Sequence, residues 1–247
     1  MPPTLLFSFA HPDDESFAAA GTAMKYAADG ARIVLVTATM GDRGKPGDPP
    51  LCAPTELASF RERELKEAAA IIGFDELHLL RYGDRALADA PAGDVRRSLV
   101  EIIRRTQPRV VFTFDPNGFN LHPDHVAISR FTSDAISAAA DGRWYPAAGA
   151  PYSVARLLWL PPIAPWDVPK IEHIENEPGA DFIFDVSPWR DRKIAALRAH
   201  RTQHLSVDRF IMQQTDPNRV VGIEIWRQAW GPPIRQRPGV DVLEGLA

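Results

Sequence analysis

The segment that decides the fold is Thr4–Glu15, with the sequence TLLFSFAHPDDE. Its first seven residues form a short apolar run of the length of a buried β-strand. A histidine, a proline and three consecutive acidic residues follow immediately. We therefore predict a buried strand that ends in a cluster of chemically active side chains.

The same pattern, a short apolar run followed by a helix-forming segment, recurs through residue 140. Continuous rather than alternating hydrophobicity indicates strands covered on both faces, and alternation of strands with helices indicates βαβ units. We therefore predict an α/β, Rossmann-like three-layer fold whose mostly parallel central sheet has the order 3-2-1-4-5. The predicted strands are Thr4–Ala10, Ile33–Thr37, Leu77–Leu80 and Arg109–Phe114, and the predicted helices are Ser16–Ala28, Thr55–Ile72, Asp94–Arg105 and Val126–Ala140.

Two stretches interrupt this alternation. Thr39–Pro54 is a long loop rich in Gly and Pro, and loops of this length are commonly functional. A Pro-rich segment at about 142–180 is expected to form an irregular wall or cap around one strand, Ala155–Leu160. Because no linker is evident, we expect a single domain over residues 1–247. Its last elements are a strand at Phe182–Val186, a helix at Pro188–His204 and a C-terminal extension from Gly231. In the earlier helix, Thr55–Ile72, we expect Thr55 to be the N-cap and Gly73 to end the helix.

Composition excludes several classes of protein. Apolar residues make up 45% of the chain and the net charge is −4, as in a globular protein rather than a disordered one. The single cysteine, Cys52, excludes an internal disulfide. Basic residues are scattered and outnumbered 28 to 32 by acidic ones, so we expect no nucleic-acid partner. No signal peptide is evident, and Leu157–Trp166 is too short to cross a membrane, so we expect a cytoplasmic protein without membrane association.

Chemistry is concentrated first in His11-Pro12-Asp13-Asp14-Glu15. Imidazole and carboxylate groups are the usual ligands of Zn²⁺ and related ions. Three adjacent carboxylates repel one another unless a cation lies among them. N-capping of the next helix is the plain structural alternative, since Asp is a preferred cap. Capping alone does not account for His11 and Pro12 at the end of a buried strand.

The second cluster is His122-Pro123-Asp124-His125, which lies between the strand Arg109–Phe114 and the helix after it. Two histidines three residues apart lie on one side of a helical turn, so both can face one ion, or one can bind while the other stays free. The preceding residues, 115–120, are turn formers that let the backbone bend over a site. A pair of surface histidines near a helix cap is the structural alternative.

The predicted topology brings the two clusters together. Both follow parallel strands, and these strands are neighbours in the order 3-2-1-4-5. Their carboxyl ends flank the crevice where the chain reverses direction, which is where such sheets bind ligands. We therefore expect residues 11–15 and 122–125 to form one metal site.

With these motifs the chain resembles the LmbE-like, or PIG-L, family of metal-dependent N-acetylglucosaminyl deacetylases, which includes enzymes of mycothiol and bacillithiol synthesis. The resemblance covers most of the chain, and its most specific part is the pair of His-Pro-Asp motifs. Asp42 stands where the family usually has Glu, and Thr202 where it usually has Ser. The other matching pieces are the loop Gly41-Asp42-Arg43-Gly44, Arg61 and Glu64, Gly118, and a late motif with Lys193, Ala196, His200 and Gln203.

The resemblance implies that His11, Asp14 and His125 bind zinc, with iron(II) as the alternative cofactor. Three protein ligands would leave one coordination position for water, as in catalytic zinc sites. Zinc lowers the pKa of such a water from near 16 to about 7. The resemblance therefore implies hydrolysis of an N-acetyl amide on an N-acetylglucosamine-type conjugate, which releases acetate and a free amine.

The resemblance also implies catalytic roles for three further residues. Asp13 would be the general base, and His122 would stabilise the oxyanion and protonate the leaving group. Asp124 would orient His122 or tune its charge. Donors aimed at an oxyanion are typically worth about 3–4 kcal/mol each.

Arg61, Asp84 and Arg43 are the predicted substrate contacts, and the expected partner is a small-molecule amino-sugar conjugate. Each has a structural alternative: Arg61 pairs with Glu64, Asp84 is a turn acid, and Arg43 is an exposed loop residue. Oligomeric state, including a homo-oligomer, is left open by the sequence.

Two other functions compete with deacetylation. Two histidines and a carboxylate also form the facial triad of non-haem Fe(II) enzymes. A metal-stabilised sugar-binding module without catalysis is the second alternative. Asp13 and His122 argue against both, because hydrolysis requires a base and an acid beside the metal and these functions do not.

Overall fold

The apolar runs of the sequence lie side by side in one seven-stranded sheet, in the order β3-β2-β1-β4-β5-β7-β6. The architecture is that of a computed structural model, which describes residues 2–246. The first five strands pair in parallel, which confirms the predicted order, and β7 pairs antiparallel with both β5 and β6. The strands are β1 (Thr4–Phe9), β2 (Arg32–Thr39), β3 (Glu76–Tyr82), β4 (Val110–Phe114), β5 (Arg156–Leu160), β6 (Phe182–Asp185) and β7 (Ile223–Trp230).

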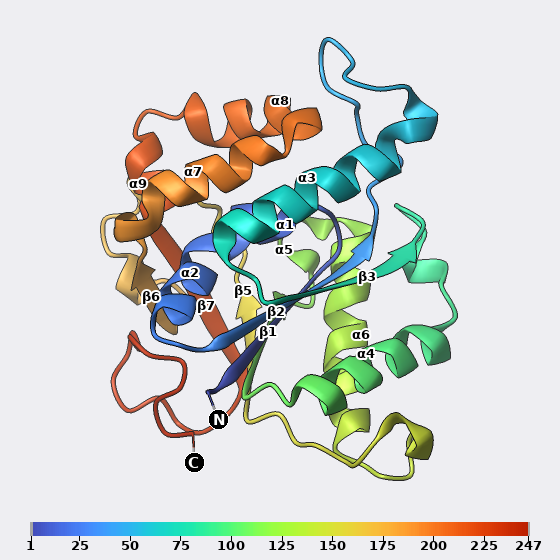
Figure 1. The fold of residues 1–247 in the computed structure, drawn as a ribbon. Coiled ribbons are helices and arrows are strands. Elements are labelled where there is room, and N and C mark those ends of the chain that lie inside the picture. Colours follow the sequence, from blue (N-terminus) through green and yellow to red (C-terminus); the bar gives the residue numbers. More distant parts are fainter. Residues whose placement is uncertain (1, 247) are drawn as a thin grey trace.

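Helices cover both faces of the sheet and complete the predicted three layers (Figure 1). One face carries α1 (Asp14–Ala18), α2 (Ala20–Ala28), α3 (Leu57–Ile72) and α7 (Arg190–Ala199), with the short α8 (His204–Val207) and α9 (Pro217–Gly222) beside α7. The other face carries α4 (Ala92–Thr106) and α6 (Pro123–Ala139), with α5 (Gly118–Leu121) leading into α6. Within residues 2–246, no helix combines the length and apolar character needed to cross a bilayer.

The core is built on the central strand pair β1 and β4. Every residue of β1 and β4 is buried, which explains why these runs are continuously apolar. Phe7 of β1 stacks on Phe112 of β4 with ring centroids 4.4 Å apart, and Trp226 of β7 packs edge-on against Phe112 at 4.8 Å. This packing fixes the positions at which the two strands end, and both chemical clusters follow those ends.

The structure corrects several of the predicted boundaries. The helix predicted at Ser16–Ala28 is two helices, because Ala19 leaves helical geometry with φ −138°. Thr55 lies in a 3₁₀ turn rather than at the cap of α3, whereas Gly73 ends α3 as predicted. The helix predicted to reach His204 ends at Ala199, since His200 adopts ψ 63°. Strand β7 was not predicted.

A buried ion pair ties β7 to both helices beneath it. The Nζ of Lys193 in α7 lies 2.6 Å from Oε1 of Glu224 in β7, and both side chains are at most 3% exposed. Glu224 also accepts hydrogen bonds from the backbone N–H of Gly21 and Thr22, at 2.8 and 2.7 Å, in the first turn of α2. The C-terminal strand is therefore joined to α2 and α7 through one carboxylate.

Replacing Lys193 with methionine should lower the free energy of unfolding by about 3–5 kcal/mol, because the buried Glu224 carboxylate loses its cation. Urea denaturation measures this change. Lys66→Met is the matched control, since Lys66 is 59% exposed and pairs with Glu62 at the surface. It should change stability by less than about 1 kcal/mol. Equal effects of the two substitutions would contradict this account of the ion pair.

Candidate active site

The two His-Pro-Asp clusters meet at the carboxyl ends of β1 and β4, which are paired neighbours in the sheet. Nδ1 of His11 lies 3.1 Å from Nε2 of His125, although 114 residues separate them. Asp14 lies beside both rings, with its carboxylate oxygens 3.6 Å from His11 Nδ1 and 3.4 Å from His125 Nε2. One carboxylate and two imidazole nitrogens therefore converge on one place.

The outward nitrogens of both rings have hydrogen-bond acceptors. His11 Nε2 lies 3.2 Å from Oδ2 of Asp124 and 3.3 Å from Oδ1 of Asp84. His125 Nδ1 lies 3.2 Å from the carbonyl oxygen of Gly118. If each outward nitrogen donates its proton, the two inward nitrogens present lone pairs to the shared place. This is the arrangement of metal-bound histidines that are oriented by an outer acceptor.

The electrostatics of this place favour a cation. Burial lowers the pKa of His11, but contacts with Asp124, Asp14 and Asp84 outweigh it and raise that pKa well above its usual value. Burial raises the pKa of Asp14, but His125 and His11 hold it well below its usual range. The donor set therefore fits a divalent metal ion, because carboxylates surround the imidazoles and positive charge stabilises the group.

Gly118 allows α5 to pass close to His125. Its φ is 67°, and a Cβ atom there would lie 2.6–2.9 Å from the backbone of Val126 and His125 and from the His125 side chain. A larger residue would therefore displace the carbonyl group that accepts from His125. The glycine that the sequence analysis matched to the family motif is thus required by a close approach of two backbone segments.

Asp13 lies at the start of α1 in an unusual backbone conformation, with φ 122°. Its N–H donates to Oε2 of Glu15 at 3.0 Å, and its Oδ2 lies 3.2 Å from Nη2 of Arg61. Burial raises the pKa of Asp13 to about 6, while the Arg61 guanidinium opposes that rise. A carboxyl group with a pKa near neutrality suits a general base.

His122 occupies the N-cap position of α6, where its Nδ1 accepts from the Asp124 N–H at 3.2 Å. A neutral His122 ring therefore carries its proton on Nε2, where it can be donated. Burial lowers the pKa of His122, as do His11 and His125. Nitrogen atoms of His11, His122 and His125 lie within 4.8 Å of one another, so this ring is also within reach of a metal.

Asp124 contacts His11 as well as His122. Its carboxylate contacts His11 and accepts from the N–H groups of Arg85 and Leu87, at 2.6 and 3.1 Å. Its negative charge opposes the lowering of the His122 pKa, so the predicted role of tuning His122 stays a prediction. Only the backbone N–H of Asp124 reaches His122. The Asp124 side chain therefore also supports His11.

The predicted substrate contacts differ in accessibility. Arg61 is 4% exposed, and its guanidinium donates to the carbonyl oxygens of Pro12 and Gly41. Asp84 is also 4% exposed and accepts from the N–H of Arg43 at 3.0 Å. The Arg43 side chain is exposed at the rim. Their roles toward a substrate stay predictions, and two of the three already hold the loop after β2 in place.

A buried layer beneath α1 went unassigned in the sequence analysis. His200 is fully buried, and its Nε2 lies 2.7 Å from Oε1 of Glu15, the same carboxylate that holds the Asp13 N–H. Nearby, Glu64 of α3 accepts from the N–H and the hydroxyl of Thr202, at 2.9 and 2.6 Å. In the sequence, the signals for this layer were Glu15 and the late motif that contains His200. Only the fold shows that they meet.

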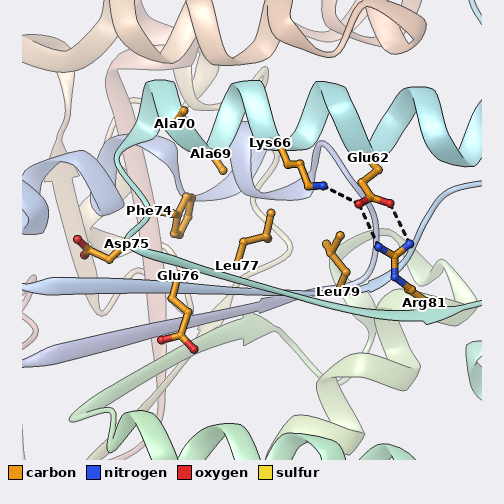
Figure 2. Close-up of a pocket in the computed structure, with 10 residues that line it drawn as sticks. All are labelled: Glu62, Lys66, Ala69, Ala70, Phe74, Asp75, Glu76, Leu77, Leu79 and Arg81. Atoms are coloured by element: carbon orange, nitrogen blue, oxygen red, sulfur yellow. Dashed lines mark hydrogen bonds and ion pairs between the residues drawn. The ribbon is translucent and has the colours of Figure 1, made fainter.

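A separate depression lies between α3 and the edge strand β3 (Figure 2). Three of its charged groups pair with one another, since Glu62 accepts from Lys66 at 2.7 Å and from Arg81 at 2.8 and 3.0 Å. The ten residues drawn there include no histidine. The chemistry is therefore concentrated at the ends of β1 and β4.

Comparison with known proteins identifies related sequences and a shared fold. The sequence profile of the PIG-L family, described as GlcNAc-PI de-N-acetylase, matches residues 6–136. A 1D-myo-inositol 2-acetamido-2-deoxy-alpha-D-glucopyranoside deacetylase of Saccharomonospora viridis is 31% identical over 98% of this chain and 100% of its own. A probable N-acetyl-alpha-D-glucosaminyl L-malate deacetylase 2 of Bacillus anthracis is 30% identical over 81% of this chain and 80% of its own. The N,N'-diacetylchitobiose deacetylase of Pyrococcus horikoshii shares the fold, with a TM-score of 0.71 at 22% identity over 91% of this chain and 83% of its own.

Glu15→Ala should lower the free energy of unfolding by about 3–5 kcal/mol, because His200 loses its buried acid and the Asp13 N–H loses its acceptor. Urea denaturation of the single variants and of Glu15→Ala/His200→Ala tests the pairing. The double variant should lose less than the two single losses together, with a coupling of about 1–3 kcal/mol. Strictly additive losses would show that the two side chains do not stabilise each other.

Proposed function

Because the chain belongs to the PIG-L family of N-acetylglucosaminyl deacetylases, we propose that it is a zinc-dependent hydrolase that removes the acetyl group from a small glucosaminyl conjugate. One observation carries the proposal: the inward nitrogens of His11 and His125 lie 3.1 Å apart, with Asp14 beside both. Asp13 adjoins this set in the sequence and is not needed to complete it.

The proposed metal ligands are His11, Asp14 and His125. Their support is that both outward nitrogens have acceptors, so the inward lone pairs are available to an ion. A divalent cation there supplies a Lewis acid that polarises an amide carbonyl and acidifies a coordinated water. Zinc fits a set of two imidazoles and one carboxylate, and iron(II) is the alternative with the same ligands.

Asp13 is the proposed general base. Its carboxylate is held toward the site by Arg61 and by the backbone contact with Glu15, so it can take a proton from the attacking water. A pKa raised toward 6 by burial makes it a better proton acceptor than an exposed aspartate. The Arg61 guanidinium keeps the ionised form populated.

His122 is the proposed acid. In the neutral ring Nδ1 accepts from the Asp124 N–H, so the proton lies on Nε2, which can donate a hydrogen bond to an oxyanion. The amine leaves once it has been protonated, and the proposed donor is His122 in its imidazolium form, which returns to the neutral ring. Asp13 and His122 come from clusters after different strands, so base and acid can act on opposite sides of one carbonyl group.

The proposed substrate is a glucosaminyl conjugate of the kind named for the relatives, in which the sugar amine carries the acetyl group and the sugar is joined to inositol or malate as its aglycone. Exposed polar side chains of the loop after β2, among them Asp42 and Arg43, lie beside Asp84 and can receive sugar hydroxyls. A non-catalytic sugar-binding module is less well supported, because such a module has no need of Asp13 and His122.

Metal analysis after dialysis tests the ligand assignment. Asp14→Ala and His125→Ala should weaken zinc binding by more than about a hundredfold, beyond the 10- to 100-fold that loss of an outer partner such as Asp124 costs. His173→Ala is the matched control, because that ring is 66% exposed at the surface. Full metal content in both ligand variants would refute the assignment.

Acetate release from glucosaminyl conjugates tests the catalytic roles. His122→Ala should retain the metal and lower kcat by about 10²–10³-fold. Asp13→Asn should retain the metal and lower kcat by about 10²–10⁴-fold. Loss of metal from the His122→Ala variant would show that His122 is a metal ligand. Metal retained by the unmodified protein, without cleavage of any amide, would favour the non-catalytic binding module. Reloading the metal-free protein with Zn²⁺ or Fe²⁺ separates the two cofactors.

A further inference from the structure

An apolar cavity of about 160 Å³ opens directly beside the proposed metal ligands. Its floor is formed by Asp13, Asp14 and His125. We call it the aromatic pocket, because its apolar walls are Phe17, Phe114, Phe119, Leu160, Trp166 and Phe210. None of the roles assigned so far uses these walls.

Three segments distant in the sequence build the outer wall of the aromatic pocket. Trp166, from the Pro-rich segment after β5, stacks on Phe210 at 4.6 Å between ring centroids. Phe119 of α5 meets Trp166 edge-on at 6.2 Å. Each of these side chains is half-buried. A wall of mutually packed rings is rigid and favours an apolar guest over water.

The topology separates this pocket from the polar side of the site. Phe114, Phe119, Leu160 and Trp166 lie at or after the ends of β4 and β5, Phe17 lies in α1 and Phe210 follows α8, whereas Asp42, Arg43 and Asp84 follow β2 and β3. Strand β1 lies between the two groups, since the sheet order is β3-β2-β1-β4-β5. An amide whose carbonyl lies at the ends of β1 and β4, with its sugar on the polar side, directs its acyl group into the aromatic pocket.

The cavity is larger than an acetyl group requires. An apolar protein cavity of about 150 Å³ accommodates a benzene ring, which has six carbons. The acetyl group offers one methyl carbon beyond the carbonyl, so most of the pocket would stay unfilled. Of the other lining residues, Asn120 and Ser206 are polar, and they leave most of the wall apolar.

We propose that the aromatic pocket is an acyl-binding subsite and that the enzyme hydrolyses N-acyl glucosamines with acyl groups of four to six carbons, and phenylacetyl, in preference to acetyl. The reaction is the proposed hydrolysis: water adds to the carbonyl carbon, the C–N bond breaks, the amine gains a proton, and the acyl group leaves as a carboxylate. The inference rests on the proposed function and deepens it by naming the acyl group that the site fits.

Rates on N-acetyl-, N-butyryl-, N-hexanoyl- and N-phenylacetylglucosamine, followed by release of free amine, test the preference. Burial of each added methylene should raise kcat/KM about fourfold, until the pocket is full. Trp166→Ala should reduce the hexanoyl-to-acetyl ratio at least tenfold, because it removes the outer wall. Trp144→Ala is the matched control, since Trp144 is 45% exposed and packs on Arg96 outside this pocket; it should leave the ratio unchanged.

Calorimetric binding of hexanoate, phenylacetate and acetate to the zinc-loaded protein gives a readout that needs no turnover. Both longer acids should bind at least tenfold more tightly than acetate, and Trp166→Ala should remove the difference. Cleavage confined to the acetyl amide, with no advantage of hexanoate over acetate, overturns the subsite and leaves the deacetylase standing. Tight hexanoate binding without cleavage of any amide supports the pocket and refutes the proposed function. The rate could instead rise when a hexyl or phenyl group is placed on the aglycone and not on the acyl group. That result also overturns the inference.

Discussion

The close approach of His11 and His125 is the constraint on which the rest of the site depends. Two imidazole nitrogens 3.1 Å apart, with a carboxylate beside both, are stable only with a shared proton or a shared cation between them. The approach exists because β1 and β4 pair in parallel and end at the same edge of the sheet. Stacking of Phe7 on Phe112 inside the sheet therefore contributes to the spacing of the two ligands outside it.

Support for the site extends well below its surface. Glu15, held by His200, fixes the N–H of Asp13 in a backbone conformation that residues other than glycine seldom adopt. Arg61 joins the Asp13 carboxylate to the loop after β2, and a Cβ on Gly41 would lie 1.9 Å from that guanidinium. The geometry of the base is thus set by buried charges from α3 and from the turn after α7. Such strain commonly persists where the surroundings determine the conformation.

Much of this fold followed from local patterns in the sequence. The continuous apolar runs predicted the five parallel strands and their order, and this order predicted that residues 11 and 125 meet. Strand β7 was missed because its sequence, IEIWRQAW, is not a continuous apolar run and because it pairs antiparallel with its neighbours, outside the βαβ pattern. The contact of Asp124 with His11 was also missed, because spacing shows which residues share a turn but not which way a side chain faces across the sheet. The aromatic pocket could not be predicted at all, since Phe119, Trp166 and Phe210 meet only in three dimensions.

The polar groups and the aromatic pocket beside the site come mainly from connections on opposite sides of strand β1. Loops after β2 and β3 present the polar groups, and segments after β4 and β5 present most of the aromatic ones, with Phe17 added from α1 and Phe210 from the segment after α8. Substitutions on one flank that spare Asp84 and Gly118, which contact His11 and His125, therefore leave the other flank in place. In evolutionary terms this layout is modular: descendants of one ancestral hydrolase can exchange what is recognised on each side independently, while inheriting the same bond-breaking core.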